Sequence, residues 1–312
     1  MKGKETTEIT TDNWDNTIVV PNIKAVEKLL KKSGKSKIMF VLLIGSYQIG
    51  KSTKIAYFIN SDKVAIGNGS SEETSGVWIY GPVSYNEFRQ RFDCDKVPDD
   101  DTCIYFIDTE GNCGFNKGFS AEETTFLLSQ IIAPYAALSN VTLTISKPSI
   151  TNNEVQQMEK MLDIFNIIRS SGNQKYSSII NVVNDIYTEN DKYKIKEEET
   201  QKTFLKRSKI YNNNFVILPK YNQAKNWNEQ DNFYIKGFRH FTKKLIIELE
   251  RCKNDSFTDW EEAFEVFKGL IGITKNQNLG SVAHQAKTNA KKSTYERLFK
   301  HDVDTIIQDK IN

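Results

Sequence analysis

The segment from Gly45 to Ser52 has the composition and spacing of a phosphate-binding loop. It fits the pattern G-x-x-x-x-G-K-[S/T] at every fixed position. Gly45 and Gly50 let the backbone wrap closely around anionic oxygens in conformations that a side chain would forbid. Successive backbone N–H groups at the start of a following helix would then point at the phosphates. The segment predicts binding of a nucleoside triphosphate.

The last residues of this loop supply a charge and a metal ligand. Lys51 places a mobile positive charge on the outer phosphates, and the hydroxyl of Ser52 is a ligand for Mg²⁺. The alternative is a chance match in a glycine-containing turn, but an apolar strand before the loop and a helix after it favour the phosphate loop. The predicted nucleotide-binding set also contains the neighbouring residues Ser46, Tyr47, Gln48, Ile49 and Thr53.

The segment Asp108-Thr109-Glu110-Gly111 follows an apolar strand predicted over Thr102 to Ile107. In phosphate-loop enzymes an Asp at the end of a neighbouring strand holds the hydration shell of Mg²⁺. A glycine shortly after it can donate its N–H to the terminal phosphate, so that the loop senses this phosphate. We therefore predict a metal role for Asp108 and nucleotide contacts for Glu110 and Gly111. The alternative is a solvated turn.

A hydroxyl between these two motifs is expected to complete the Mg²⁺ coordination. The candidates lie in the segment Glu72 to Trp78, ahead of a predicted strand. A hydroxyl there would become ordered when the triphosphate binds. Thr74 is the predicted metal ligand, and Ser75 is the nearby alternative.

The elements that position these motifs predict an α/β fold with a predominantly parallel sheet. The apolar run Ile38 to Ile44 predicts a buried strand ahead of the loop, and residues 53–59 predict a helix after it. Doubly wound sheets bind ligands at the carboxyl ends of their strands, where both motifs fall.

Other predicted strands are Val77 to Tyr80, stopped by Gly81-Pro82, Val141 to Ile145, Ile179 to Val183 and Phe215 to Leu218. Predicted helices are Asn22 to Lys32, Glu122 to Ile132, Glu154 to Ile168 and Gly237 to Glu250. From Trp260 the pattern is helical only, with interruptions at Gly269 to Gly272 and Gln277 to Gly280 and a polar helix over Ser281 to Ile311.

The composition is that of a soluble globular protein, with 38% hydrophobic and 26% charged residues among 312. The 42 Lys and Arg residues nearly balance the 40 Asp and Glu residues, so nucleic acid is not predicted as a partner. No apolar run approaches the roughly 20 residues that cross a bilayer, and residues 1–15 contain no signal core. A cytoplasmic location is expected. The four cysteines, Cys94, Cys103, Cys113 and Cys252, lack metal-ligand spacing and are expected to be free thiols.

Three motifs together resemble a known family. The phosphate loop with Tyr47 at its third position, the run Thr74 to Trp78 and the segment Asp108 to Gly111 resemble the large GTPases of the guanylate-binding protein and atlastin group. This group belongs to the dynamin-like superfamily, and its second motif is T-x-G-[IV]-W. The resemblance covers roughly residues 15–250 and is closer to the guanylate-binding branch. It implies a three-layer P-loop sandwich, Mg²⁺-dependent hydrolysis of GTP to GDP, a nucleotide-dependent homodimer, and recruitment to membranes as a peripheral protein. Tyr47 resembles the family residue whose ring caps the phosphates, and the alternative is a tyrosine packed on the neighbouring helix.

The resemblance also implies a base-reading pair after a late strand. Such proteins read guanine with an Arg-Asp pair, and here the strand Ile179 to Val183 is followed by Asn184 and Asp185. The carboxylate of Asp185 can accept hydrogen bonds from the guanine N1–H and exocyclic amine, which adenine cannot supply. Asn184 departs from the family's Arg, so guanine selectivity is expected to be weaker. The alternative for Asp185 is an acid that caps a turn.

Gln48 is the departure that bears most on catalysis. The family carries an Arg at this loop position, where a cationic finger stabilises charge on the transferred phosphoryl group. Gln48 is neutral and cannot replace that charge. Hydrolysis is then slow, or a partner supplies an arginine in trans, or the protein is a binding switch with little turnover. The candidate arginines are Arg89, Arg91 and Arg207.

The sequence thus predicts a GTP-binding domain over residues 1–255 and a helical extension over residues 256–312. The favoured function is a GTPase in which Lys51, Ser52, Thr74 and Gln48 are the catalytic set. One alternative is a GTP-regulated scaffold with negligible catalysis, which Gln48 motivates. The other is an ATP-using phosphate-loop enzyme, which Asn184 motivates.

Overall fold

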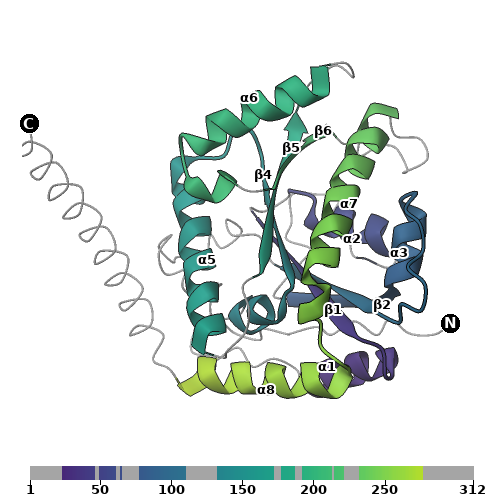
Figure 1. The fold of residues 1–312 in the computed structure, drawn as a ribbon. Helices are drawn as coiled ribbons and strands as arrows, with labels where there is room; N and C mark the ends of the chain where they lie inside the picture. Colours follow the sequence, from purple (N-terminus) through teal and green to yellow (C-terminus); the bar gives the residue numbers. More distant parts are fainter. Residues whose placement is uncertain are drawn as a thin grey trace, which may run out of the picture.

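A computed structural model describes residues 23–45, 49–60, 64, 77–109, 132–171, 177–186, 192–212, 214–220 and 232–276. Its centre is a six-stranded sheet in the order β2-β3-β1-β4-β5-β6 (Figure 1). Neighbouring strands pair in parallel, except that β2 runs antiparallel to β3. This confirms the predicted α/β fold with a predominantly parallel sheet. The strands are β1 (Ile38–Gly45), β2 (Val77–Ser84), β3 (Cys103–Thr109), β4 (Val141–Ser146), β5 (Ser178–Ile186) and β6 (Phe215–Pro219).

Helices cover both faces of the sheet and make three layers (Figure 1). The hydrophobic cluster on one face includes residues from α1, α5, α8 and the helical residues 132–138. The cluster on the other face includes residues from α2, α3 and α7. The α-helices are α1 (Ile23–Leu30), α2 (Lys51–Ile59), α3 (Tyr85–Arg91), α5 (Asn152–Ser171), α6 (Tyr193–Leu205), α7 (Asn232–Cys252) and α8 (Trp260–Asn276). Short 3₁₀ turns are η1 (Lys31–Ser33), η3 (Lys209–Asn212) and η5 (Lys253–Asp255).

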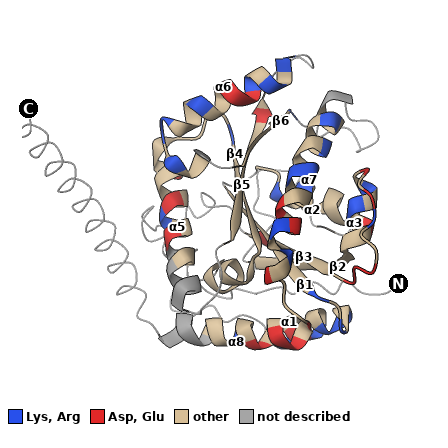
Figure 2. Cartoon of the chain, in the orientation of Figure 1, with Lys and Arg blue, Asp and Glu red and all other residues tan. Residues whose placement is uncertain are grey.

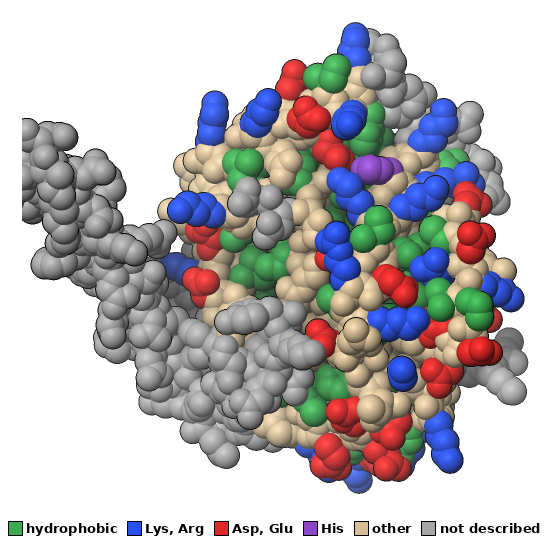
Figure 3. Space-filling view, in the orientation of Figure 1, with side chains coloured by type: hydrophobic (Ala, Val, Ile, Leu, Met, Phe, Trp, Pro, Cys, Tyr) green, Lys and Arg blue, Asp and Glu red, His purple; other side chains and the backbone are tan. Residues whose placement is uncertain are grey.

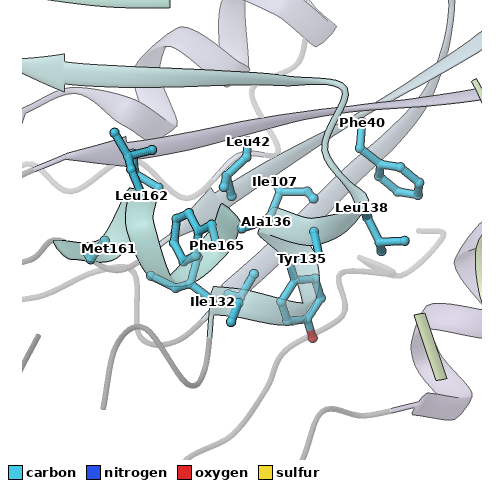
Figure 4. Close-up of a cluster of buried hydrophobic side chains, with 14 of the residues drawn as sticks. Phe40, Leu42, Ile107, Ile132, Tyr135, Ala136, Leu138, Met161, Leu162 and Phe165 are labelled. Carbon is cyan, nitrogen blue, oxygen red and sulfur yellow. The ribbon is translucent and has the colours of Figure 1, made fainter. Parts of the chain in front are cut away.

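The alternation of side chains along β1 explains why the sheet has two apolar faces. All eight residues of β1 are buried. Phe40, Leu42 and Ile44 face one core, and the residues between them, such as Val41, face the other. Figure 4 shows Phe40, Leu42 and Ile107 beside Ile132, Tyr135, Ala136 and Leu138 of the helical residues 132–138, and beside Met161, Leu162 and Phe165 of α5. The central strand is therefore inaccessible to solvent, and its carboxyl end leads into the predicted phosphate loop.

Three predicted boundaries were wrong. Strand β2 continues through Gly81 and Pro82 instead of stopping there, with a shift in its pairing to β3 between Tyr80 and Val83. Because β2 is an edge strand, a proline costs it no central ladder bond. Strand β5 extends through Asn184 and Asp185 to Ile186, and helix α8 runs without a break across Gly269 to Gly272.

The described part of the C-terminal region packs on the same core as the sheet. Ile38 and Phe257 form an antiparallel bridge with two backbone hydrogen bonds of 2.9 Å. Phe267 of α8 is fully buried and packs against Tyr135 with the two rings tilted, their centroids 5.1 Å apart. The boundary at residue 255 stays a prediction. The predicted helices over residues 122–131 and 281–311 and the break at Gln277 to Gly280 lie outside the described residues.

Charges of both signs are mixed over the surface. Figure 2 shows Lys and Arg together with Asp and Glu on α3, α6 and α7, and Figure 3 shows the two signs interspersed on the face in view. In the part of the chain that the structure describes, none of the helices combines the length and apolar character needed to span a bilayer. Cys94, Cys103 and Cys252 are free thiols, as predicted, and Cys113 lies outside the described residues.

Candidate nucleotide-binding site

The two fixed glycines of the phosphate loop are required by the backbone. Gly45 ends β1 with φ 155°, and a Cβ built there would lie 2.2 Å from the carbonyl oxygen of Ile145 on β4. Gly50 caps α2 in the left-handed conformation, with φ 79°. Side chains at either position are therefore disfavoured, as the sequence predicts. The first turn of α2 begins here, so the loop ends at a helix N-terminus, which is a place that suits an anion.

The side chain of Lys51 reaches back to the end of β1. Lys51 is 7% exposed, and its Nζ donates to the carbonyl oxygen of Gly45 at 3.2 Å. This contact spans the loop from the residue after Gly50 to the residue that ends β1. The ammonium is thus held at the site where the loop would cradle the outer phosphates of a nucleotide.

Ser52 and Asp108 join the start of α2 to the end of β3. The hydroxyl of Ser52 donates to Oδ2 of Asp108 at 2.6 Å. Asp108 is fully buried, and its Oδ1 has no hydrogen-bond partner among the described residues. Burial raises the pKa of Asp108 above its usual range, although the charge of Lys51 and the hydrogen bond from Ser52 oppose this rise. Two of the three predicted metal residues, Ser52 and Asp108, therefore lie in direct contact.

The chemistry of this pair fits Mg²⁺. Mg²⁺ prefers hard oxygen ligands and is held by one or two protein groups together with waters and substrate phosphates. A hydroxyl oxygen and a carboxylate whose second, buried oxygen has no partner among the described residues supply such ligands. Within the described ranges no group of three or more His, Cys, Asp or Glu side chains could hold a metal by itself. Ser52 and Asp108 would hold the ion only together with the phosphates.

Asn184 ties β5 to the phosphate loop. Its side chain is 8% exposed, and its Nδ2 donates to the carbonyl oxygen of Ile49 at 2.5 Å. The Oδ1 of the same side chain is buried and has no hydrogen-bond partner in the described part of the chain. The residue that stands in place of the expected Arg therefore holds the loop through its amide, and its carbonyl oxygen remains available as an acceptor.

Asp185 follows in a position that turns it away from the core. Its φ of 60° is left-handed, a conformation that Asp tolerates better than most residues, and its side chain is exposed. The pairing of β5 with β6 shifts between Val183 and Ile186, so Asp185 lies in an irregular part of the strand. An exposed carboxylate at the carboxyl end of a parallel strand can accept hydrogen bonds from a base.

Lys54 is a residue of this region that the sequence interpretation did not single out. Only 3% of it is exposed, and its Nζ donates to the carbonyl oxygen of Gly50 at 3.4 Å. Burial lowers the pKa of Lys54 to about 7; the negative charge of Asp185 opposes this shift, and the charge of Lys51 adds to it. The available signal was a lysine on the apolar face of a predicted helix, directly after the loop.

The remaining predicted positions are only partly placed. Thr53 is half-buried in the first turn of α2, and Ile49 is buried beside Gly50. The buried hydroxyl of Thr109 donates to the carbonyl oxygen of Leu43 at 2.7 Å, which links β3 to β1. The predicted residues Ser46, Tyr47, Gln48, Thr74, Ser75, Glu110 and Gly111 lie outside the described residues.

The three candidate arginines each bind a neighbouring element. Arg91 on α3 donates to the carbonyl oxygen of Phe58, in the last turn of α2 and thus at the far end of this helix from the loop. Arg89 donates to the carbonyl oxygen of Asp95 at 2.6 Å and lies 3.5 Å from Glu250. The third, Arg207, donates to the carbonyl oxygen of Ile150 at 2.5 Å. All three contribute to packing within this chain.

Comparisons with known proteins identify the family. The model of the N-terminal domain of guanylate-binding proteins matches residues 15–188, and a comparison with curated protein sequences gave no match. A structure of Era in complex with MgGDPNP and 16S ribosomal RNA aligns at 16% identity and a TM-score of 0.37, over 59% of this chain and 51% of that chain. A variant of Aquifex aeolicus Era bound to GDP and AlF4⁻ also aligns at 16% identity and a TM-score of 0.37, over 59% of this chain and 51% of that chain. Translation elongation factor SelB from Methanococcus maripaludis, in complex with the GTP analogue GppNHp, aligns at 14% identity and a TM-score of 0.37, over 71% of this chain and 35% of that chain. The chain thus matches about half or less of the length of these proteins, and TM-scores this low support no argument about function. The family match spans more than half of the 312 residues, and the chain belongs to the guanylate-binding protein family.

Proposed function

We propose that this chain binds GTP together with Mg²⁺ and hydrolyses it to GDP. The observation that carries the proposal is the contact between Ser52 and Asp108 at 2.6 Å beside the buried ammonium of Lys51. This contact brings the end of the phosphate loop and the end of β3 to one place. Membership of the guanylate-binding protein family supports guanine as the base.

The residues of the loop would each bind one part of the phosphate chain. Lys51, now on the carbonyl oxygen of Gly45, would transfer its hydrogen bond to the β- and γ-phosphate oxygens. Ser52 and Thr74 would ligate the metal, Asp108 would hold its water shell, and Gly111 would sense the γ-phosphate. When bound, Mg²⁺ neutralises charge that develops on the β- and γ-phosphate oxygens.

The carboxylate of Asp185 would read the base. Its exposed position at the end of β5 leaves its oxygens free to accept from the N1–H and exocyclic amine of guanine. The amide of Asn184 is engaged with Ile49, so it would support the loop more than the base. An ATP-using enzyme remains an alternative because residue 184 is Asn in place of the family's Arg, so no arginine there assists Asp185.

A GTP-regulated binding protein with negligible catalysis is the second candidate. It is supported by Gln48, which cannot supply the positive charge of a finger residue. The packing contacts of Arg89, Arg91 and Arg207 support it as well, since each of these would have to leave its partner to act on a phosphate. The presence of Gln48 is also compatible with slow hydrolysis by this chain, or with an arginine finger that a partner supplies in trans.

Assembly and location are proposed from family membership. Nucleotide-dependent self-association would bring two copies together, and the protein would be cytoplasmic and recruited to membranes as a peripheral protein. The division into a GTP-binding domain, residues 1–255, and a helical extension belongs to the same proposal. The described part of this extension, through α8, packs on the sheet core.

Single-turnover release of phosphate from GTP tests the proposed activity. Enzyme in excess over GTP, with Mg²⁺, should give product within minutes, whereas no product over hours would favour the binding protein. Lys51→Met is the control, because it removes the charge at the loop and keeps the length of the side chain. A rate that rises with protein concentration would indicate self-association and an arginine supplied in trans. Parallel reactions with ATP test the alternative nucleotide.

A further inference from the structure

Helix α2 carries a buried lysine, Lys54, that has no role in the proposed phosphate site. The other buried positions of this helix are Ile55, Ala56, Phe58 and Lys51. Lys51 is accounted for by the phosphates, whereas Lys54 places a second ammonium on an apolar helix face. Burying a charge without compensation is costly, so its neighbours should explain its presence.

The ammonium of Lys54 lies between the phosphate loop and the end of β5. Side chains of a helix lean toward its N-terminus, and Lys54 reaches back one turn to the carbonyl oxygen of Gly50 at 3.4 Å. A Cβ built on Gly50 would lie 3.7 Å from this Nζ and 3.9 Å from Nδ2 of Asn184. The lysine and the asparagine thus border the same glycine, and the charge of Asp185 acts on the lysine.

Lys54 and Asn184 can make more hydrogen bonds than the described residues around them accept or donate. An ammonium carries three donors, and Gly50 accepts one of them within the described ranges. The buried Oδ1 of Asn184 has no partner there either. Buried polar groups are normally satisfied, so donors and acceptors that the described residues leave only partly satisfied, beside an exposed carboxylate, indicate a polar ligand. The position is next to the residues that would read the base.

We propose that Lys54 is a second base-reading residue, which donates a hydrogen bond to O6 of guanine while Asp185 accepts from N1–H and the exocyclic amine. The proposal rests on the proposed binding of GTP. Guanine carries acceptors at O6 and N7, which suit a cationic donor, and donors that suit a carboxylate. Adenine carries an amino group at position 6, and this donor would meet the donor of Lys54. The cation that position 184 lacks then comes from another element.

Substitution of Lys54 combined with nucleotide analogues tests this assignment. Lys54→Met keeps the length of the side chain and removes a buried charge, so the variant should remain folded, which its thermal unfolding checks. The dissociation constants of GTP, ITP, ATP and 2-aminopurine riboside triphosphate are measured for both proteins with Mg²⁺. ITP keeps O6 and lacks the exocyclic amine, and the 2-aminopurine nucleotide keeps the amine and lacks O6. Lys243→Met, an exposed lysine on α7, is the matched control.

The proposal expects a loss that depends on O6. Lys54→Met should weaken GTP and ITP by about tenfold or more and should change the 2-aminopurine nucleotide by about twofold or less. ATP should bind as well as before or more tightly, because the donor that opposes its amino group is removed. Equal weakening of all four nucleotides would overturn the proposal and leave Lys54 a role in loop geometry alone. Unchanged binding of GTP would overturn it as well. A wild-type protein that binds none of the four would instead refute the proposed GTP binding itself, which separates the two failures.

Discussion

The side-chain amide of Asn184 donates a hydrogen bond of 2.5 Å to the carbonyl oxygen of Ile49, 135 residues earlier in the chain. This bond fixes the phosphate loop to the strand that carries Asp185. Parts of the site that would bind phosphates and base are therefore coupled through one buried side chain. Because the Oδ1 of Asn184 has no hydrogen-bond partner among the described residues, loss of this side chain removes the contact with Ile49 and leaves no described donor without its acceptor.

Asn184→Ala should weaken GTP and ATP by the same factor. Losing the bond to Ile49 costs about 1 kcal/mol of loop order, or about fivefold in the dissociation constant of either nucleotide. Asp185→Ala is the contrasting variant, because it should weaken GTP by about 10- to 100-fold and leave ATP nearly unchanged. Calorimetric titration of both variants measures this. Unchanged discrimination between GTP and ATP in Asp185→Ala would refute the role given to Asp185.

Asp108→Asn should separate stability from metal dependence. Burial raises the pKa of this carboxyl, so the neutral amide removes a desolvation cost and should raise the melting temperature of the nucleotide-free protein. The same change should reduce the Mg²⁺-dependent part of GTP affinity by about 10- to 100-fold, as for other residues around a metal. Melting curves without nucleotide and GTP titrations with Mg²⁺ or EDTA measure both effects. A full Mg²⁺ response in the variant would contradict the proposed metal site.

Gln48→Arg should raise the turnover number for GTP. A cationic finger stabilises charge on the transferred phosphoryl group and is worth on the order of a thousandfold or more. Gln48→Ala serves as the control for loss of the native side chain. Phosphate release under single-turnover conditions measures all three proteins. If the Arg variant is no faster than the wild type, position 48 cannot act as a finger in this chain.

The pH dependence of stability should contain a contribution from Glu197 on α6. Burial raises the pKa of Glu197, but hydrogen bonds and charges from His240 and Lys244 outweigh it, so the pKa lies below its ordinary 4.5. A lowered folded-state pKa stabilises the protein above pH 4.5, and this contribution is lost as the pH falls through the folded-state pKa. Glu197→Gln should therefore lower stability by about 1 kcal/mol at neutral pH and by progressively less as the pH falls below 4.5.

Urea unfolding between pH 3 and pH 7 measures this difference. Glu198→Gln is the matched control, because Glu198 is the exposed neighbour on the same helix. Two contacts explain why the charged carboxylate of Glu197 should stabilise the fold. Lys244 donates to Glu197 at 3.0 Å, and Glu197 accepts from the backbone N–H of Ile217 at 3.3 Å. A difference between wild type and Glu197→Gln that is independent of pH would show that the carboxylate charge is not responsible.

The sequence predicted the centre of the fold because its signals are local. The apolar run of β1 and the glycines beside it fix a strand and a loop without reference to the rest of the chain. Helices α3 and α6 were missed because their patterns are weak; α6 has only Thr200 and Phe204 buried. Helix α8 continues across Gly269, where nothing lies within 4 Å of an added Cβ, because Phe267 and Leu270 pack on the core and override the propensity of glycine.

The part of the site that lies within short sequence motifs was predictable. The roles of Lys51, Ser52 and Asp108 follow from residue type and position after a strand, and the structure brings the last two into contact. The bond between Asn184 and Ile49 joins residues far apart in the chain, so no local pattern could indicate it. The burial of Lys54 likewise depends on elements that the sequence does not place beside α2.

The most direct test of GTP binding by the phosphate loop is calorimetric titration of the protein with GTP and Mg²⁺, in parallel for wild type and Lys51→Met. We expect the wild type to bind and the variant to lose about 1.5–3 kcal/mol of binding free energy, because the ammonium would bond to charged phosphates. Absence of binding heat with both GTP and ATP, or equal affinity in the two proteins, would contradict binding by this loop.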